Sequence, residues 1–234
     1  MDAASEVNRK RPRAGDPVPE DPRLARLHRR ILACHSCADA GLLDHPAPVV
    51  PAPIKASVVL VGQAPGRVEE AVGRPFSGRA GRQLFRWLEQ AGLGEEEEAR
   101  QAVYLSSITK CFPGPAPSGT GDRRPSPAEV ELCRGHLESQ LRLLRPWLIL
   151  GVGQMAVDRL LGPLPMHLAV GRIFGPGGLE LSLEDAIRSS QRPLLLPLPH
   201  PSGASRWLNL AEHRVLLARA LQTLAALLRA GGEV

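Results

Sequence analysis

An apolar run that ends in a glycine–proline turn constrains the fold of this chain more than any other stretch. Val58–Val61 contains no polar residue, stops at Gly62, and is followed by Pro65 and Gly66. Such a run predicts a strand buried on both faces, and proline with glycine forces a tight turn with an exposed backbone. Open α/β sheets bind ligands beyond the carboxyl ends of their strands. The stretch therefore predicts an α/β protein with a binding site at this turn.

A second glycine-rich loop, Gly73–Gly81, follows closely and opens an amphipathic helix over residues 79–91. The apolar residues of this helix recur at helical spacing: Leu84, Trp87, Leu88 and Ala91. Either loop alone is compatible with an ordinary connection between a strand and a helix. Two such loops so close together favour a functional surface.

Three further apolar segments predict strands, over residues 103–108, 146–151 and 194–198. Residues 164–192 are weakly patterned and suggest a hairpin with a glycine-rich turn at 175–178. Because the strands alternate with helices, we predict a three-layer α/β/α sandwich around a central, mostly parallel four-stranded sheet.

Capping signals locate the other helices. Pro22 begins the first helix, and Ser126 with Glu129 forms a capping box at the start of another. The last helix runs from about residue 211 to 229. Glu95–Glu98 is predicted to be a solvated acidic patch between a helix and a strand.

The ends of the chain and its charge add broader expectations. Residues 1–20 are polar with a basic run, which predicts a disordered basic tail before a single domain over residues 21–234. No apolar run could cross a membrane and the N-terminus has no hydrophobic segment, so we expect a cytoplasmic protein without a membrane partner. We also expect it to act as a monomer. The net charge of +5 is almost entirely arginine. Arginine suits phosphate contacts, although a GC-rich genome gives the same composition.

The carboxyl ends of parallel strands meet at one edge of a sheet. Here those ends are Gln63, Ser106 with Ser107, and His200, which lies between two prolines. We expect these residues to converge at one crevice.

All four cysteines fit one metal site. Cys34 and Cys37 are separated by two residues, and Cys111 and Cys133 lie beside a strand and on a helix. Disulfides are disfavoured in the cytoplasm, so four such thiols favour a metal. Zinc and a [4Fe–4S] cluster both accept four thiolates, and the spacing does not separate them. The alternative, scattered buried cysteines, applies to Cys133 better than to the close pair.

From about Leu27 to the last helix, apart from an insertion at 113–125, the chain resembles the iron–sulfur uracil-DNA glycosylases of family 4. The resemblance rests on the two glycine-rich loops, the four-cysteine pattern, and two short motifs: Lys110-Cys111 and His200-Pro201-Ser202. It implies a DNA-repair enzyme that flips uracil, or a related deaminated base, out of DNA and hydrolyses its N-glycosidic bond to leave an abasic site. It also implies a [4Fe–4S] cluster in preference to zinc.

The resemblance assigns roles around the base. Phe76 is the ring on which the flipped base stacks, and the amides around Gln63 and Ala64 donate to a base carbonyl. His200 donates to O2, where negative charge develops. Together with Gln63 and Ser107, it occupies a catalytic position of the family.

The resemblance also implies DNA contacts. Ser77 and Gly78 open a helix whose N-terminal amides suit a phosphate. Ser202, Ser205 and Arg206 belong to a loop that grips the backbone and enters the minor groove. Arg206 either fills the gap left by the flipped base or contacts a phosphate.

Three departures from the family pattern indicate a side branch with a shifted or relaxed base preference. Gln63 stands where the family has glutamate, and Ser107 where it has an asparagine that reads N3–H and O4. The loop 200–206 is closer to the mismatch-specific glycosylases. Glu69 or Glu70 is a candidate replacement for the lost carboxylate, although adjacent glutamates are more often a helix surface.

Two alternatives stay open. The substitutions at Gln63 and Ser107 are compatible with a catalytically weak or inactive iron–sulfur protein that binds damaged bases in DNA. The second alternative is an α/β protein with a structural metal and no role on DNA. In that case the resemblance of the Phe76 and His200 loops to the family would be coincidental.

Overall fold

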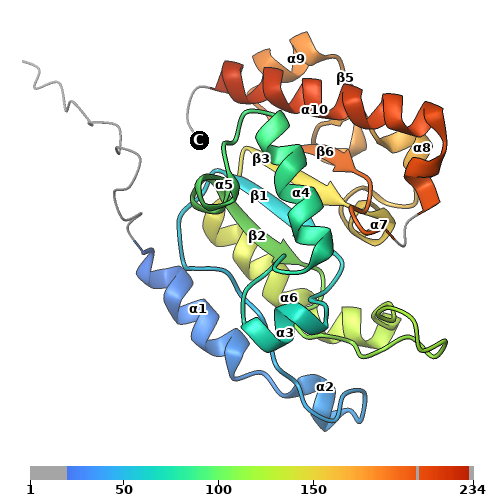
Figure 1. Cartoon of the computed structure of the whole chain (residues 1–234). Coiled ribbons are helices and arrows are strands. Elements are labelled where there is room, and N and C mark those ends of the chain that lie inside the picture. Colours follow the sequence, from blue (N-terminus) through green and yellow to red (C-terminus); the bar gives the residue numbers. More distant parts are fainter. Residues whose placement is uncertain (1–19, 204–205, 232–234) are drawn as a thin grey trace, which may run out of the picture.

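A six-stranded sheet forms the centre of the protein (Figure 1). The computed structural model describes residues 20–203 and 206–231, so the predicted basic tail lies, apart from Glu20, outside the described residues. The strand order is β2-β1-β3-β6-β4-β5. The four parallel strands are β1 Val58–Gly62, β2 Val103–Ser107, β3 Leu148–Val152 and β6 Leu194–Leu198. All four were predicted, within two residues at each end.

The prediction of four strands is nevertheless wrong, because a hairpin extends the sheet. Strands β4 (Ile173–Phe174) and β5 (Glu180–Leu181) pair antiparallel around the short 3-10 helix η1 (Pro176–Gly178). Phe174 of β4 pairs with Leu195 of β6. The hairpin itself was expected, but strands of two residues are too short to show the alternation that identifies a sheet strand.

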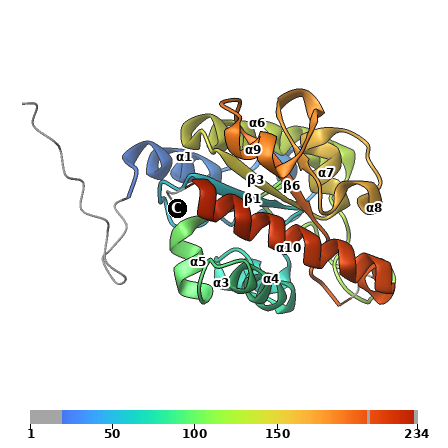
Figure 2. The same cartoon turned by 90° about the horizontal axis from the view of Figure 1, so that it is seen from above.

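Helices cover both faces of the sheet, which gives the predicted three layers. The helices of the described residues are α1 Pro22–Leu32, α2 Ser36–Asp39, α3 Arg67–Val72, α4 Arg79–Gln90, α5 Glu96–Ala102, α6 Pro127–Leu144, α7 Gln154–Leu161, α8 Met166–Ala169, α9 Leu183–Arg188, α10 Ala211–Gly231 and the 3-10 helix η2 Arg206–Asn209. Figure 2 shows α1 and α6 on one side of the sheet and α4 and α10 on the other. No helix in the described part of the chain combines the length and the apolar character needed to cross a bilayer.

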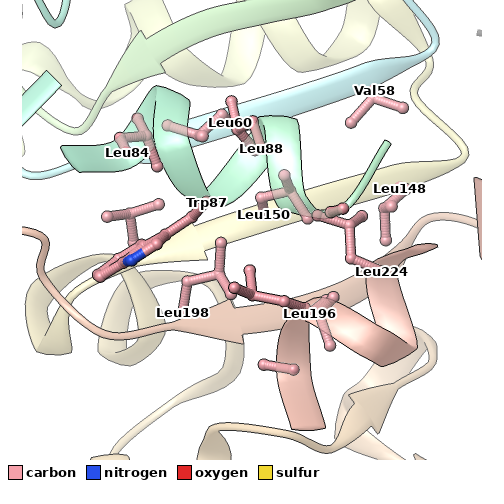
Figure 3. Close-up of a cluster of buried hydrophobic side chains, with 14 of the residues drawn as sticks. Val58, Leu60, Leu84, Trp87, Leu88, Leu148, Leu150, Leu196, Leu198 and Leu224 are labelled. Atoms are coloured by element: carbon pink, nitrogen blue, oxygen red, sulfur yellow. The ribbon is translucent and has the colours of Figure 1, made fainter. Parts of the chain in front are cut away.

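The apolar run of β1 supplies side chains to both layers. Val58 and Leu60 join the cluster formed with Trp87 of α4 and Leu224 of α10 (Figure 3). Val59 and Val61 join the opposite cluster, formed with residues of α1 and α6. A strand buried on both faces is held in one register, because a slip by one residue would exchange its two sets of side chains. The position of the turn after Gly62 is therefore fixed.

The capping box is present at α6, where Ser126 Oγ accepts the Glu129 amide at 3.3 Å and the Glu129 carboxylate accepts the Ser126 amide at 2.6 Å. The acidic patch differs from the expectation. Its side chains are largely exposed, but they begin helix α5, which the sequence did not predict. Glu95 is the N-cap, and its amide donates to the Glu98 carboxylate at 2.9 Å. Carboxylates in a first turn favour a helix because they face its positive end.

Candidate active site

The carboxyl ends of the parallel strands form one edge, as predicted. Gly62 pairs with Ser107, and the ladder continues past the strands because the Thr109 amide donates to the Gln63 carbonyl at 3.2 Å. On the other side, β3 joins β1 to β6, and His200 follows β6. A Cβ placed on Gly153, which follows β3, would lie 3.2 Å from His200 Cδ2. The turn after β1, the end of β2 and His200 therefore share this edge.

The Phe76 ring lies against the backbone at the end of β1. A Cβ placed on Gly62 would be 2.8 Å from Phe76 Cζ, so only glycine leaves room for the ring. Phe76 has a φ of 54°, in the left-handed region that bulky residues rarely adopt. Its carbonyl oxygen occupies the space of a side chain at Gly81, where a Cβ would lie at 1.8 Å. Glycines of both loops thus define where Phe76 sits.

Glu69 of α3 joins the two glycine-rich loops. One carboxylate oxygen accepts the Gly66 amide at 3.0 Å and the other accepts the Gly78 amide at 2.8 Å. The carboxylate is therefore bound to the backbone of both loops. The capping-box spacing from Gly66 was the available signal for the first bond, but nothing in the sequence indicated the second.

Ser107 is buried at the end of β2, and its hydroxyl donates to the Thr109 carbonyl at 2.7 Å. The hydroxyl proton is committed, which leaves the oxygen lone pairs as the free hydrogen-bonding group. The Ser107 carbonyl in turn accepts the Lys110 ammonium.

A buried chain of hydrogen bonds supports this end of β2. Its members, in order, are His28, Tyr104, Gln140, Ser106 and Lys110, with distances of 2.6, 2.7, 2.8 and 2.9 Å between successive members. Burial, and then the charge of Lys110, lower the pKa of His28 to about 4. The end of β2 is thus tied through buried polar groups to α1 and α6.

His200 is held by the residue that follows its proline. The Ser202 backbone amide donates to His200 Nδ1 at 3.2 Å, and the Ser202 hydroxyl lies 2.9 Å from the same nitrogen. An amide can only donate, so Nδ1 is the acceptor and the neutral ring carries its proton on Nε2. Burial, and then the charge of Arg124, lower the pKa of His200 below its ordinary value of 6.5. The imidazole is therefore neutral at neutral pH.

The insertion at 113–125 borders the site, a role that the sequence did not reveal. Its two halves meet at an isolated bridge between Pro115 and Asp122, and Arg123 anchors it through two hydrogen bonds of 2.7 and 2.6 Å to Glu129. The Asp122 carboxylate accepts the Arg67 amide, and one oxygen lies 2.8 Å from a Cβ placed on Gly66. The insertion reaches the first glycine-rich turn, although its proline and glycine content suggested only an irregular loop.

The residues predicted to contact DNA come from two loops: Ser77 and Gly78 precede α4, and Ser202 and Arg206 follow β6. The Ser77 hydroxyl donates to the Arg74 carbonyl at 2.9 Å, and the Gly78 amide is bound to Glu69. The next amides, in the first turn of α4, have no partner within the helix. Arg206 is exposed, whereas Ser205 lies outside the described residues.

The four cysteines line one small cavity. All are free thiols: Cys34 and Cys37 flank the start of α2, Cys111 follows β2 and Cys133 is on α6. Burial, and then the neighbouring cysteines, raise the pKa of Cys111 to about 12, so a thiolate there needs a bound cation. Among the residues that the structure describes, no group of His, Cys, Asp or Glu is arranged to hold a single metal ion. Four sulfur donors around one cavity suit either a zinc ion or an iron–sulfur cluster.

Comparison with known proteins assigns the family. The family model of the Uracil DNA glycosylase superfamily matches residues 49–225. A Type-4 uracil-DNA glycosylase of Archaeoglobus fulgidus is 37% identical over 130 residues, which are 56% of this chain and 59% of the relative. One of Pyrobaculum aerophilum is 32% identical over 140 residues, 59% of this chain and 64% of the relative. One of Sulfurisphaera tokodaii is 29% identical over 182 residues, 77% of this chain and 75% of the relative.

The chain thus spans less than two thirds of the length of the first two relatives. The family match, however, includes both glycine-rich loops, Cys111, Cys133 and His200, and it covers more than half of the chain. The chain belongs to the uracil DNA glycosylase superfamily.

Proposed function

We propose that this protein is a monofunctional DNA glycosylase that removes uracil, or a related deaminated base, from DNA and leaves an abasic site. One observation carries the proposal: an aromatic ring on Gly62 and a neutral histidine after β6 stand at the same edge of the sheet. A flipped base needs both, since a ring stacks the base and a donor stabilises it as it leaves. The similarity to Type-4 uracil-DNA glycosylases supports uracil as the base.

In the proposed mechanism the flipped base stacks on Phe76, and the amides of the turn at Gln63 and Ala64 donate to one of its carbonyls. The N-glycosidic bond breaks with both electrons passing to N1 of the base. His200 Nε2–H donates to O2, where the negative charge gathers. Water then bonds to C1′, and the proton that it loses passes to the solvent or to the departing uracil anion. The Gln63 side chain has no basic group at neutral pH, so its role is to orient water by hydrogen bonds. The rate enhancement then comes mainly from stabilising the negative charge on the departing base.

Ser107 reads the edge of the base. Because its proton is committed to Thr109, its oxygen acts as an acceptor and fits the N3–H of uracil. Cytosine has a lone pair at N3 and would face the serine oxygen with a second acceptor. The proposal therefore includes discrimination against cytosine at this position.

DNA is the proposed partner. The first-turn amides of α4, which follow Ser77 and Gly78, donate to a phosphate oxygen in this proposal. Ser202, Ser205 and Arg206 are the proposed contacts to the DNA backbone and minor groove, and the net charge of +5 favours association. We further propose that the protein has a single domain after a basic tail. It would act as a monomer in the cytoplasm.

A [4Fe–4S] cluster is the proposed cofactor, held by Cys34, Cys37, Cys111 and Cys133. The donor set fits, because four thiols surround one cavity. When bound, the cluster supplies four covalent links that hold α2, the loop after β2 and α6 together. Iron and acid-labile sulfide assays of protein purified without oxygen test this, with about four iron atoms expected per chain. Zinc in their place would contradict the assignment.

An excision assay tests the function. Labelled oligonucleotides that contain uracil, hypoxanthine, xanthine, cytosine or thymine are incubated with the protein and then cleaved with alkali. We expect strand scission after alkali on the uracil strand and none on cytosine or thymine. Scission on none of the deaminated bases would overturn the enzymatic proposal. Tight binding of the uracil duplex without base release would instead favour the inactive binding protein.

A further inference from the structure

Arg100 of α5 reaches across to the loop that carries Phe76. Its Nη1 donates to the Pro75 carbonyl at 2.8 Å and its Nη2 to the Phe76 carbonyl at 3.0 Å. These carbonyls stand before and after the Phe76 Cα, so the two bonds restrain both backbone dihedrals of that residue. The donor is charged, which makes such bonds shorter and stronger than neutral ones.

The guanidinium is itself fixed in place. Its Cζ lies 4.4 Å from the centre of the Phe85 ring on α4, and Nη2 lies 2.8 Å from the Glu96 carboxylate on α5. Only 9% of the Arg100 side chain is exposed. A cation over an aromatic face and beside a carboxylate keeps one orientation, and here that orientation is set by two helices.

Phe76 needs such a restraint. Its φ of 54° is unfavourable for a side chain with a Cβ, and conformations of this kind persist only where the surroundings impose them. Gly81 leaves room for the Phe76 carbonyl, but room alone does not hold it there. In the part of the chain that the structure describes, Arg100 provides the side-chain hydrogen bonds to this carbonyl and to that of Pro75.

We infer that Arg100 is a positioning residue for base excision. Arg100 holds the backbone of Phe76 in the left-handed conformation that presents the ring over Gly62, and Arg100 itself does not touch the DNA. The inference rests on the proposed function for the role of the ring. The arrangement of the loop is a separate matter and can be measured by itself.

The arrangement is tested by fluorine NMR on protein labelled with 4-fluorophenylalanine. The chain has four phenylalanines, and the Phe76 signal is assigned by its loss in Phe76→Leu. Arg100→Met keeps an apolar stem over Phe85 but removes the donors. We expect the Phe76 signal to move and broaden in this variant. The matched control, Glu96→Gln, removes the charge of the ion pair but keeps an acceptor for the guanidinium, so both carbonyl bonds and the Phe76 signal should stay in place. An unchanged Phe76 signal in a folded Arg100→Met protein would overturn the inference, whether or not the chain excises any base.

The consequence for excision is tested by a double-mutant cycle under single-turnover conditions, well below the melting temperature of each variant. Arg100→Met should slow uracil excision about ten- to a hundredfold, because a small displacement of a positioned group has effects of that size. In a Phe76→Ala background the same substitution should change the rate by no more than about twofold, since the ring it positions is gone. Equal losses in both backgrounds, or a loss in Glu96→Gln as large as in Arg100→Met, would contradict the inference.

Discussion

His200 and Ser107 each have one hydrogen-bonding group committed within the protein, which decides what the other group can do. Nδ1 of His200 accepts the Ser202 amide, so Nε2 is the donor. The Ser107 hydroxyl donates to a carbonyl, so its oxygen is an acceptor. One donor for O2 and one acceptor for N3–H match adjacent groups of uracil. At the scale of single residues, these two hydrogen bonds support the proposal that uracil is the base.

Replacing His200 with alanine should slow excision about a hundredfold, because it removes a donor from the charge that develops on the leaving base. Affinity for uracil-containing DNA should change little. Single-turnover rates and equilibrium binding, measured separately, check this. Ser202→Ala is the matched control, since its backbone amide still donates to Nδ1 and the loss of rate should be smaller. Equal losses of rate and affinity in His200→Ala would contradict the assigned role.

Replacing Ser107 with alanine should slow uracil excision about tenfold, because a net hydrogen bond contributes about 1 kcal/mol and the N3–H would be left unpaired. The preference for uracil over cytosine should weaken in the same variant. Competition between the two substrates in one reaction measures the change directly. An unaltered rate and preference would show that Ser107 does not face the base.

At the scale of elements, the loops of the site are held by contacts between segments that are distant in sequence. Glu69 of α3 bonds the start of α4. The insertion at 113–125 is pinned to α6 through Arg123 and Glu129. Each contact fixes a loop whose glycines would otherwise leave it many conformations.

Glu69→Gln should loosen both glycine-rich loops. A carboxylate can accept both amides, whereas one end of a glutamine amide is itself a donor and would oppose an N–H group. We expect a loss of about 1–3 kcal/mol in the free energy of unfolding, because one buried amide loses its partner. Thermal and urea unfolding measure the loss. Glu70→Gln, on the adjacent residue, should be nearly neutral. An equal effect of both substitutions would be inconsistent with Glu69 holding the two loops together.

The strands and most helices could be predicted from the sequence, because their signals are local. β1 is an uninterrupted apolar run, and α6 begins with a complete capping box. Helix α5 was missed because four consecutive glutamates were interpreted as solvated charge and not as a first turn. The two strands of the hairpin were too short for periodicity to count them as part of the sheet.

At the scale of the whole molecule, the candidate site could be predicted only in part. Parallel strands bring their carboxyl ends together, so the placement of Gln63, Ser107 and His200 at one edge of the sheet followed from the fold class. Other features depend on packing between elements that are distant in sequence, and no residue spacing predicts them. They are the tautomer of His200, the contact of Asp122 with the first glycine-rich turn and that of Arg100 with the Phe76 loop. The sequence showed that Gln63 stands where the family has glutamate. It did not show which side chains lie near Gln63 in the folded protein.

The buried network beneath β2 makes stability depend on pH. The pKa of His28 is lowered to about 4 by burial and then by Lys110, so the unfolded chain binds a proton there that the folded protein does not. Stability that is present above pH 6.5 is therefore lost as the pH falls toward 4. The contribution is up to about 3 kcal/mol. His136 and His200, whose pKa values are also lowered by burial, add in the same direction.

His28→Gln should flatten this dependence between pH 6.5 and 4, as followed by urea unfolding at several pH values. His167→Gln, at an exposed histidine, is the control and should keep the wild-type slope. If His28→Gln leaves the pH dependence of the free energy of unfolding unchanged, the proton is bound at another group.

The most direct test of the central claim is the stoichiometry of the reaction on a uracil-containing duplex in a single turnover. The account predicts that free uracil appears in equal amount to abasic sites, that strands stay intact until alkali is added, and that His200→Ala slows both products together. Bound duplex that releases no uracil and gains no abasic sites would contradict it.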